Sequence, residues 1–274
     1  MPNIVVRGIT GLVYVLSVIA AIFIHPIVCV AYFFIIAIAG QNEFYHNVKK
    51  YNIKPNILLG NLLGIILYFM IVICSSCEED LSAVFLAALI VVSLLVFIVE
   101  LYSKAKEHFT NVAYTFLGGI YAVVPLALTS LIISIKGDFS PMILMSVFIF
   151  AWCNDTFAYL TGMKFGKHKL FERISPKKTW EGSIGGAVSV IIAAVIISLF
   201  SDSMQVYDYI IIAVLTSIVG TFGDLAESMF KRQIGVKDSG NILPGHGGIL
   251  DRFDILLLVL PVVYAYLKIR FIFC

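Results

Sequence analysis

Long apolar runs are the feature that most constrains how this chain can fold. About nine stretches of roughly 20 apolar residues follow one another, which is the length a helix needs to cross a hydrocarbon core. Inside a bilayer the backbone must satisfy its own hydrogen bonds, as a helix does. We therefore predict an all-α, polytopic integral membrane protein. Its spans are expected near residues 5–24, 27–44, 56–76, 81–100, 112–135, 141–162, 183–201, 207–228 and 253–273.

Composition agrees with the membrane class. Hydrophobic residues make up 60% of the sequence and charged residues 13%, whereas soluble domains are about one quarter charged. The two longest polar stretches, near residues 163–181 and 229–253, have about 20–25 residues each, which is too few to fold as separate soluble domains. The first apolar run follows Arg7 as in a signal peptide, but no small-residue cleavage site follows it. We interpret it as a retained first span.

Basic residues are unevenly distributed among the segments between the spans. With the N-terminus placed in the cytoplasm, cytoplasmic segments hold 16 of the 19 Lys and Arg residues. The opposite side holds only Lys136, Lys268 and Arg270, beside an acidic turn at residues 78–80. This asymmetry follows the positive-inside rule. We therefore expect a cytoplasmic N-terminus, an odd number of spans and a C-terminus on the outside.

The two halves of the chain differ in their polar content. Spans before residue 135 are nearly featureless, and the polar groups lie after Pro141. We predict that residues 1–137 form a scaffold of spans that provides the dimer contacts and the lipid environment, and that residues 138–274 form the catalytic half. The catalytic half would include cytoplasmic loops at 163–182 and 229–253. Cys74 and Cys77 have CxxC spacing, but no second pair or nearby His completes a zinc set, so we interpret them as small apolar residues.

The first polar group is Asp155, which lies within the sixth apolar run near its cytoplasmic end. An ionised carboxylate at the centre of a span costs about 3 kcal/mol on insertion scales. Such a residue usually has a partner or a function. The alternative is a structural hydrogen bond to a neighbouring helix, or a protonated side chain.

The second polar group is the segment Ser175–Gly182, which precedes the seventh run. Ser175, Lys177, Lys178 and Thr179 lie at the start of a predicted helix, where N–H groups and ammonium groups can bind a phosphate. An ordinary structural interpretation fits equally well. In that case a hydroxyl caps the helix, a tryptophan lies in the interfacial belt and the lysines anchor the inside face.

The third polar group begins in the eighth run. Asp224, Glu227, Ser228 and Lys231 are spaced i, i+3, i+4 and i+7, so they share one face if the helix continues through them. Two further acids, Asp251 and Asp254, open the ninth run. Carboxylate oxygens from two helix ends suit Mg²⁺. The alternative is that Asp251 caps its helix and each acid pairs with a nearby base.

The segment between these acids is basic and rich in glycine. Lys231, Arg232 and Lys237 carry charges that suit a polyphosphate, and the glycines of segment 245–248 let the backbone approach a ligand closely. His246 would bind phosphate or lie at the interface. From the residues alone we infer a metal–polyphosphate site at the cytoplasmic surface. A nucleotide would reach it from the cytoplasm and a lipid from the bilayer.

Residues 228–254 resemble the signature of phosphatidate cytidylyltransferases, also called CDP-diacylglycerol synthases. That signature reads S-x-φ-K-R-x4-K-D-x-(small)-x2-φ-(P or G)-x-H-G-G-φ-x-D-R-φ-D, with φ apolar. The chain satisfies it throughout, from Ser228 to Asp254. The segments around Asp155 and Ser175–Gly182 are also similar to the family. In the N-terminal half the resemblance is limited to apolar spans.

The resemblance implies the reaction CTP + phosphatidate → CDP-diacylglycerol + pyrophosphate, a step of phospholipid biosynthesis. It implies Mg²⁺ dependence with a two-metal centre, in which the second ion, divalent or monovalent, stays open. It also implies a homodimer in the bacterial inner membrane, with the active site facing the cytoplasm and no nucleic-acid partner.

The resemblance also implies roles for individual residues. Asp224 and Asp251 match metal ligands, with Glu227 and Asp254 close by. The catalytic set is then Asp224, Asp251, Lys231 and Arg232. The residues expected to bind CTP or phosphatidate are Asp155, Ser175, Lys177, Lys178, Thr179, Lys231, Arg232, Lys237, Asp238 and His246. Which of Asp155, Ser175, Lys178, Thr179 and His246 contact a substrate stays open.

Three other classes of protein deserve comparison. A transporter could move a proton or an ion through Asp155, but transporters often show two related halves, and this sequence shows no internal repeat. A CTP-dependent lipid-alcohol kinase would pass the γ-phosphate to an alcohol and release CDP, so its products would identify it. A purely structural membrane subunit would leave the complete signature unexplained.

Overall fold

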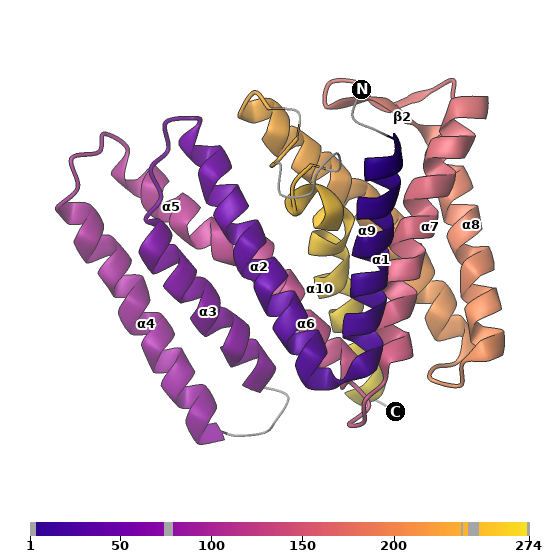
Figure 1. Ribbon diagram of the computed structural model, residues 1–274, viewed down its shortest axis with the longest axis horizontal. Coiled ribbons are helices and arrows are strands. Elements are labelled where there is room, and N and C mark those ends of the chain that lie inside the picture. Colours follow the sequence, from indigo (N-terminus) through magenta and orange to yellow (C-terminus); the bar gives the residue numbers. More distant parts are fainter. Residues whose placement is uncertain (1–3, 74–78, 237, 241–246, 273–274) are drawn as a thin grey trace. The chain divides into compact units, whose positions relative to one another are not determined.

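The computed structural model describes the chain except for residues 1–3, 74–78, 237, 241–246 and 273–274 (Figure 1). Cys74 and Cys77, which we interpret as small apolar residues, therefore lie outside the described residues, as do Lys237 and His246. The chain forms two compact units. The first comprises residues 1–131 and 234–252, and the second comprises residues 132–233 and 253–274.

The first unit is helical. Its elements are α1 (Ile4–Ile24), α2 (Pro26–Lys49), α3 (Ile57–Ile73), α4 (Glu79–Leu101), α5 (His108–Gly118), the π-helix η1 (Gly119–Val123), most of α6 (Val124–Ile133) and the first residues of α10 (Leu250–Ile272). Helix α2 packs against α1, α3 and η1, and α3 packs against α4. Pro26 occupies the first turn of α2, where its missing N–H costs no hydrogen bond.

A cluster of branched aliphatic side chains joins α3, α4 and α5. Leu63 and Ile66 of α3 are buried against Val92 and Val96 of α4 and against Val112 of α5. Between membrane helices such contacts stabilise through van der Waals packing rather than through the removal of apolar surface from water. These contacts fix α3 within the unit, although its other face is apolar and exposed, as Leu58 and Leu62 show.

The second unit contains α7 (Pro141–Phe165), β1 (Lys169–Phe171), β2 (Ser175–Thr179), α8 (Trp180–Phe200), α9 (Val206–Gln233) and most of α10. Helices α7 and α8 pack closely, and both contact α9. The close approach depends on small residues, because a Cβ atom on Gly186 would lie 2.7 Å from Asn154 Oδ1 and 3.1 Å from the Ala158 Cβ.

Six helices among the described residues are long and apolar enough to cross a membrane: Pro26–Lys49, Asp80–Leu101, His108–Ile133, Pro141–Phe165, Trp180–Phe200 and Val206–Gln233. Gly8–Ile24 and Ile57–Ile73 are shorter apolar helices. Only 11% of the most apolar stretch of Asp80–Leu101 is buried, and 22% of that of Trp180–Phe200. Apolar helices with such exposed faces are suited to lipid. The prediction of a multi-pass, all-α membrane protein is confirmed, while the count of nine spans and their orientation stay predictions.

Three local features differ from the expectations. The loop expected at residues 163–182 contains a short antiparallel hairpin, in which Lys169 pairs with Thr179 and Phe171 with Ser175. The predicted span 112–135 is a continuous helix that contains a π-helical segment at 119–123. Helix α9 continues to Gln233, beyond the predicted end at 228.

The division into units also differs from the predicted division at residue 137. The break near residue 131 is close to it, but residues 234–252 belong to the same unit as the N-terminal helices. Part of the signature segment is therefore packed by the half of the chain that we expected to be only a scaffold. The proposed split between a scaffold half and a catalytic half stays a prediction.

Candidate functional site

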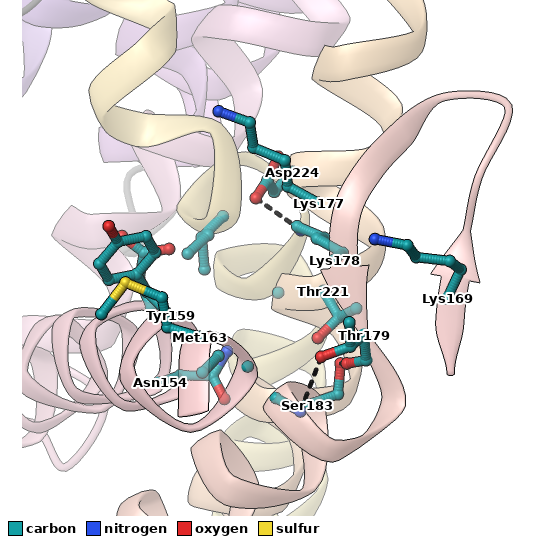
Figure 2. Close-up of a pocket in the computed structure, with 16 residues that line it drawn as sticks. Asn154, Tyr159, Met163, Lys169, Lys177, Lys178, Thr179, Ser183, Thr221 and Asp224 are labelled. Carbon is teal, nitrogen blue, oxygen red and sulfur yellow. Dashed lines mark hydrogen bonds and ion pairs between the residues drawn. The ribbon is translucent and has the colours of Figure 1, made fainter. Parts of the chain in front are cut away.

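The second unit contains a partly open cavity of about 500 Å³ (Figure 2). It draws on α7, both strands of the hairpin, and helices α8, α9 and α10. The lining residues are Asn154, Asp155, Ala158, Tyr159, Gly162, Met163, Lys169, Lys177, Lys178, Thr179, Gly182, Ser183, Gly220, Thr221, Asp224 and Ile255. Residues from all three polar groups of the sequence thus line one cavity.

Helix α7 contributes the first polar group. Asp155 is exposed to the cavity, and Asn154 beside it is buried. The Asn154 Oδ1 atom accepts a hydrogen bond of 3.0 Å from Ser217 Oγ of α9. Acidic residues within membrane spans usually face a bundle interior or a polar cavity. Asp155 fits that pattern, and its buried neighbour Asn154 links α7 to α9.

The hairpin and the start of α8 contribute the second polar group. Thr179 caps α8, because its Oγ1 accepts a hydrogen bond of 3.2 Å from the Gly182 N–H. Lys177 and Lys178 line the cavity with Thr179. Ser175 begins β2 and is not among the lining residues. The capping interpretation and the phosphate interpretation are therefore compatible, since the capped helix end opens into the cavity.

Glu181, in the first turn of α8, fixes the base of the hairpin. Its carboxylate accepts hydrogen bonds from the backbone N–H of Lys167 at 3.0 Å and from that of His168 at 3.2 Å. The His168 Nδ1 lies 2.6 Å from Glu181 Oε1. The hairpin thereby holds Lys169 of β1 and Lys177 of β2 at the same cavity.

Helix α9 contributes the third polar group, and its four predicted residues do share one face. Ser228 Oγ donates a hydrogen bond of 3.2 Å to Asp224 Oδ1. Lys231 Nζ lies 2.6 Å from Glu227 Oε2, and Glu227 is buried. Only Asp224 of this face lines the cavity. Arg232 is exposed near the end of the helix.

The closest electrostatic contact in the cavity joins the hairpin to α9. The Lys178 Nζ lies 2.5 Å from Asp224 Oδ2, and both side chains are about one quarter exposed, at 25% and 23%. Figure 2 shows Lys178 reaching Asp224, with Lys177 beside it. In such a pair the lysine can exchange its carboxylate for a phosphate, and the carboxylate can exchange its lysine for a cation.

Small residues let α10 approach α9 beside Asp224. A Cβ atom on Gly223 would lie 2.7 Å from the Asp254 carbonyl oxygen, and one on Gly220 would lie 2.7 Å from Ile255 Cγ2. Asp254 is consequently close enough to Asp224, Asp155 and Lys231 to interact with them electrostatically. Asp224, Asp155 and Lys231 therefore contribute to the electrostatic surroundings of Asp254.

Asp251 lies in the first unit, at the start of α10. Its Oδ2 accepts hydrogen bonds of 2.8 Å from the Ser239 N–H and from the Gly248 N–H. Gly247 has φ of 85°, a conformation that favours glycine. Asp238 is exposed in the preceding bend. Asp251 therefore organises the described ends of the segment between α9 and α10, residues 234–249, which we call the signature loop.

The predicted metal ligands do not form one cluster within a unit. Asp224, Glu227 and Asp254 belong to the second unit and Asp251 to the first. Over the part of the chain that is described, no three Asp, Glu, His or Cys side chains are grouped closely enough to hold a metal ion. The carboxylate oxygens of Asp224 and Asp254 are nevertheless the hard ligands that suit Mg²⁺. The metal site stays a prediction.

Several cavity residues were missed by the sequence reasoning. Lys169, Ser183 and Thr221 line the cavity, but each lies outside the motifs that drew attention. For Lys169 a signal existed, since it belongs to the basic segment 163–182. A more consequential omission is Glu43, an acid near the end of the second apolar run. Ionisable residues within apolar runs of span length are expected to be functional, so the sequence did offer a reason to single out Glu43.

Comparisons with known proteins agree with these features. Residues 5–270 match the family described as "Cytidylyltransferase family". A phosphatidate cytidylyltransferase of Staphylococcus saprophyticus is 32% identical over 260 residues, which cover 94% of this chain and 96% of that protein. One from Staphylococcus haemolyticus is 31% identical over 94% of this chain and 96% of that protein. One from Haemophilus influenzae is 47% identical over 124 residues, 43% of each chain.

Proposed function

Because this chain belongs to the cytidylyltransferase family, we propose that it is a phosphatidate cytidylyltransferase that converts CTP and phosphatidate into CDP-diacylglycerol and pyrophosphate. The main observation in support is the similarity to phosphatidate cytidylyltransferases over 94% of the chain. The cavity supports it, because lysines and acidic side chains from separate segments line one space. That combination suits a reaction between two phosphate-bearing substrates.

The proposed reaction needs no covalent intermediate on the enzyme. A phosphate oxygen of phosphatidate attacks the α-phosphorus of CTP and forms a new P–O bond. The bond between the α-phosphorus and the oxygen that bridges to the β-phosphorus breaks, and pyrophosphate leaves with the electron pair. Catalysis of such transfers rests mainly on positioning and on charge stabilisation. A Ser–His–Asp arrangement is therefore not required.

The lysines of the hairpin supply the positive charge for this task. Lys169 and Lys177 line the cavity, and Lys178 is held there by Asp224. We assign these three residues to the phosphates of the two substrates. The N-terminus of α8, capped by Thr179, adds the partial positive charge of a helix end. Together they would reduce the repulsion between two anions that must come into contact.

Mg²⁺ is the proposed cofactor, in a centre whose second ion stays open between divalent and monovalent. Asp224 and Asp251 would hold it, with Glu227 and Asp254 close by. When bound, the ion would neutralise phosphate charge and polarise the phosphoryl oxygens. Of these acids, Glu227 is paired with Lys231 and buried, so it would have to leave that lysine to become a ligand.

The remaining assignments belong to the same proposal. Lys231 and Arg232 would stabilise the departing pyrophosphate. The other proposed substrate contacts are Asp155, Ser175, Lys237, Asp238 and His246. The proposed setting is a homodimer with about nine spans per chain, in the bacterial inner membrane, with a cytoplasmic N-terminus and a cytoplasm-facing site. The excess of basic residues on one side supports this orientation.

A product assay on detergent-purified protein tests the reaction. CTP labelled with ³²P at the α-phosphorus is supplied with phosphatidate and Mg²⁺, and parallel samples contain EDTA. Label should move into a chloroform-soluble lipid while pyrophosphate is released, and EDTA should abolish both. In a parallel sample that supplies a lipid alcohol in place of phosphatidate, label in water-soluble CDP together with a phosphorylated lipid would indicate a lipid-alcohol kinase. Folded protein that consumes no CTP would contradict the proposed function.

A further inference from the structure

Glu43 is a buried carboxylate in the part of the chain where we expected only scaffold. It lies in the last turns of α2 and is 6% exposed. Burying an ionised carboxylate is expensive unless it is hydrogen-bonded or paired. The surroundings of Glu43 must therefore supply donors, and they do so from a distant part of the sequence within the same unit.

The donors come from both ends of the signature loop. The Ile249 N–H donates to Glu43 Oε2 at 2.9 Å, and the Leu250 N–H donates to Oε1 at 3.0 Å. Ser239 Oγ donates to Oε1 at 2.5 Å. Ser239 precedes the undescribed residues 241–246, and Ile249 and Leu250 follow them. One side chain of α2 thus holds the two described ends of the loop.

The two backbone hydrogen bonds from the start of α10 to Glu43 have a clear physical basis. Leu250 is the first residue of α10, and the first N–H groups of a helix have no partner inside it. The carboxylate of Glu43 satisfies two such groups and places its negative charge at the positive end of the helix dipole. Hydrogen bonds to a charged acceptor are about twice as strong as neutral ones. Glu43 therefore caps the start of α10.

Asp251 completes the same arrangement from the loop side. It accepts the N–H groups of Ser239 and Gly248, and Asn47 of α2 donates its side-chain amide to the Ser239 carbonyl oxygen. Ser239 therefore uses its hydroxyl, its N–H and its carbonyl group in three separate contacts. Any displacement of Glu43 would be transmitted to Asp251 through Ser239 and through the start of α10.

Two glycines allow the loop to close over this carboxylate. A Cβ atom on Gly248 would overlap Glu43 Oε1, and one on Gly240 would lie 2.5 Å from Glu43 Oε2. Gly248 is one of the fixed glycines of the signature, and Gly240 occupies its small-residue position. Close approach to Glu43 gives both positions a physical reason to remain small.

From these contacts we propose that Glu43 is a positioning residue for the transfer reaction: it fixes the start of α10 and thereby the orientation of Asp251. It does not contact substrate in this role, because its two oxygens are directed to loop donors. The inference rests on the proposed function for the catalytic use of Asp251. The anchoring of the loop by Glu43 is a separate property and can be measured without turnover.

The test compares Glu43→Gln and Glu43→Ala with the matched control Glu107→Gln, which removes an exposed carboxylate from the same unit. Glutamine is the sharper change, because it keeps the size but replaces one acceptor oxygen with an NH₂ group that faces backbone N–H donors. Displacement of catalytic groups by about 1 Å can cost about 100-fold in rate. We expect kcat to fall about 10- to 100-fold in both variants, with KM for CTP within about 2-fold of wild type and the control unchanged.

Hydrogen exchange supplies the readout that does not depend on turnover. Exchange at the Ile249 and Leu250 amides should accelerate in both Glu43 variants, while amides of α7–α9 keep their wild-type rates. Unchanged exchange at these two amides, unchanged kcat, or acceleration throughout the protein would each overturn the inference. Wild-type protein that consumes no CTP would instead remove the proposed function, and the exchange result would still decide whether Glu43 anchors the loop.

Discussion

Asp224 and Asp251 are both predicted metal ligands, but their carboxylates are bound by different kinds of partner. Asp224 in the second unit is bound by two side chains, Lys178 and Ser228, and lines a cavity. Asp251 in the first unit accepts two backbone N–H groups. Side-chain partners can rotate away at little cost, whereas backbone donors in a packed loop cannot. The comparison indicates an exchangeable carboxylate in the cavity and a preorganised one at the loop.

The charge of Asp224 should have the largest effect. Asp224→Asn keeps the shape of the side chain but removes the charge that holds Lys178 and that would bind the metal. We expect turnover to fall at least about 100-fold, as for the loss of a group that stabilises transition-state charge, while the protein still inserts and folds. Lipid product formed from labelled CTP measures the rate, and size-exclusion chromatography checks the fold. Asp202→Asn, an exposed acid of the same unit, is the control, and near-normal turnover in Asp224→Asn would refute the metal assignment.

Asp251→Asn separates the charge of Asp251 from its contacts with the loop. The amide keeps one oxygen that can accept the N–H groups of Ser239 and Gly248, so the loop should remain in place. Turnover should nevertheless fall about 100-fold if the charge is catalytic. Kinetics together with hydrogen exchange at Gly248 test both statements. Faster exchange at Gly248 would show that the charge itself is needed to hold the loop, and would reduce the contrast with Asp224.

A variant of Lys178 tests whether the side-chain partner of Asp224 also binds a substrate phosphate. Lys178→Gln removes the ion pair and one proposed phosphate contact, so KM for CTP or for phosphatidate should rise about 10-fold, in line with the loss of one hydrogen bond to a charged group. The stability loss should be small, because exposed or partly exposed ion pairs contribute about 0–1 kcal/mol. Steady-state kinetics with each substrate varied in turn is the measurement. A large fall in thermal stability with both KM values unchanged would make Lys178 a structural residue.

Thr179 should have the smallest effect, and mainly on stability. Thr179→Ala removes the hydroxyl that caps α8 and should cost about 1 kcal/mol. Thr179→Ser keeps the capping oxygen and should behave as wild type. Thermal unfolding in detergent compares the two variants. Equal stability would show that the cap does not hold the hairpin and α8 in place.

Much of the fold could be predicted because its causes are local. Apolar runs of span length become helices wherever they occur, and Pro26 and Pro141 lie in the first turns of their helices. The i, i+3, i+4, i+7 spacing from Asp224 to Lys231 produced a shared face once α9 continued through it. The capping role of Thr179 was weighed for the same local reason. Such features depend on residues a few positions apart.

The features that could not be predicted depend on contacts between distant residues. Glu43 meets Ile249 and Leu250 across more than 200 positions, and no short motif records that pairing. Lys169 reaches the cavity only because a hairpin returns the chain, and that hairpin is fixed by Glu181. The polar groups at Asp155, Lys178 and Asp224 were each visible in the sequence. Their meeting in one cavity required the packing of α7, α8 and α9.

The most direct test of the proposed reaction follows the oxygen atoms of phosphatidate. Phosphatidate carrying ¹⁸O at the non-bridging oxygens of its phosphate is converted with unlabelled CTP and Mg²⁺, and both products are analysed by mass spectrometry. Attack by the lipid phosphate on the α-phosphorus should leave all of the label in CDP-diacylglycerol, with one labelled oxygen in the diphosphate bridge, and none in pyrophosphate. Label in pyrophosphate, or loss of label from the lipid product, would contradict the account.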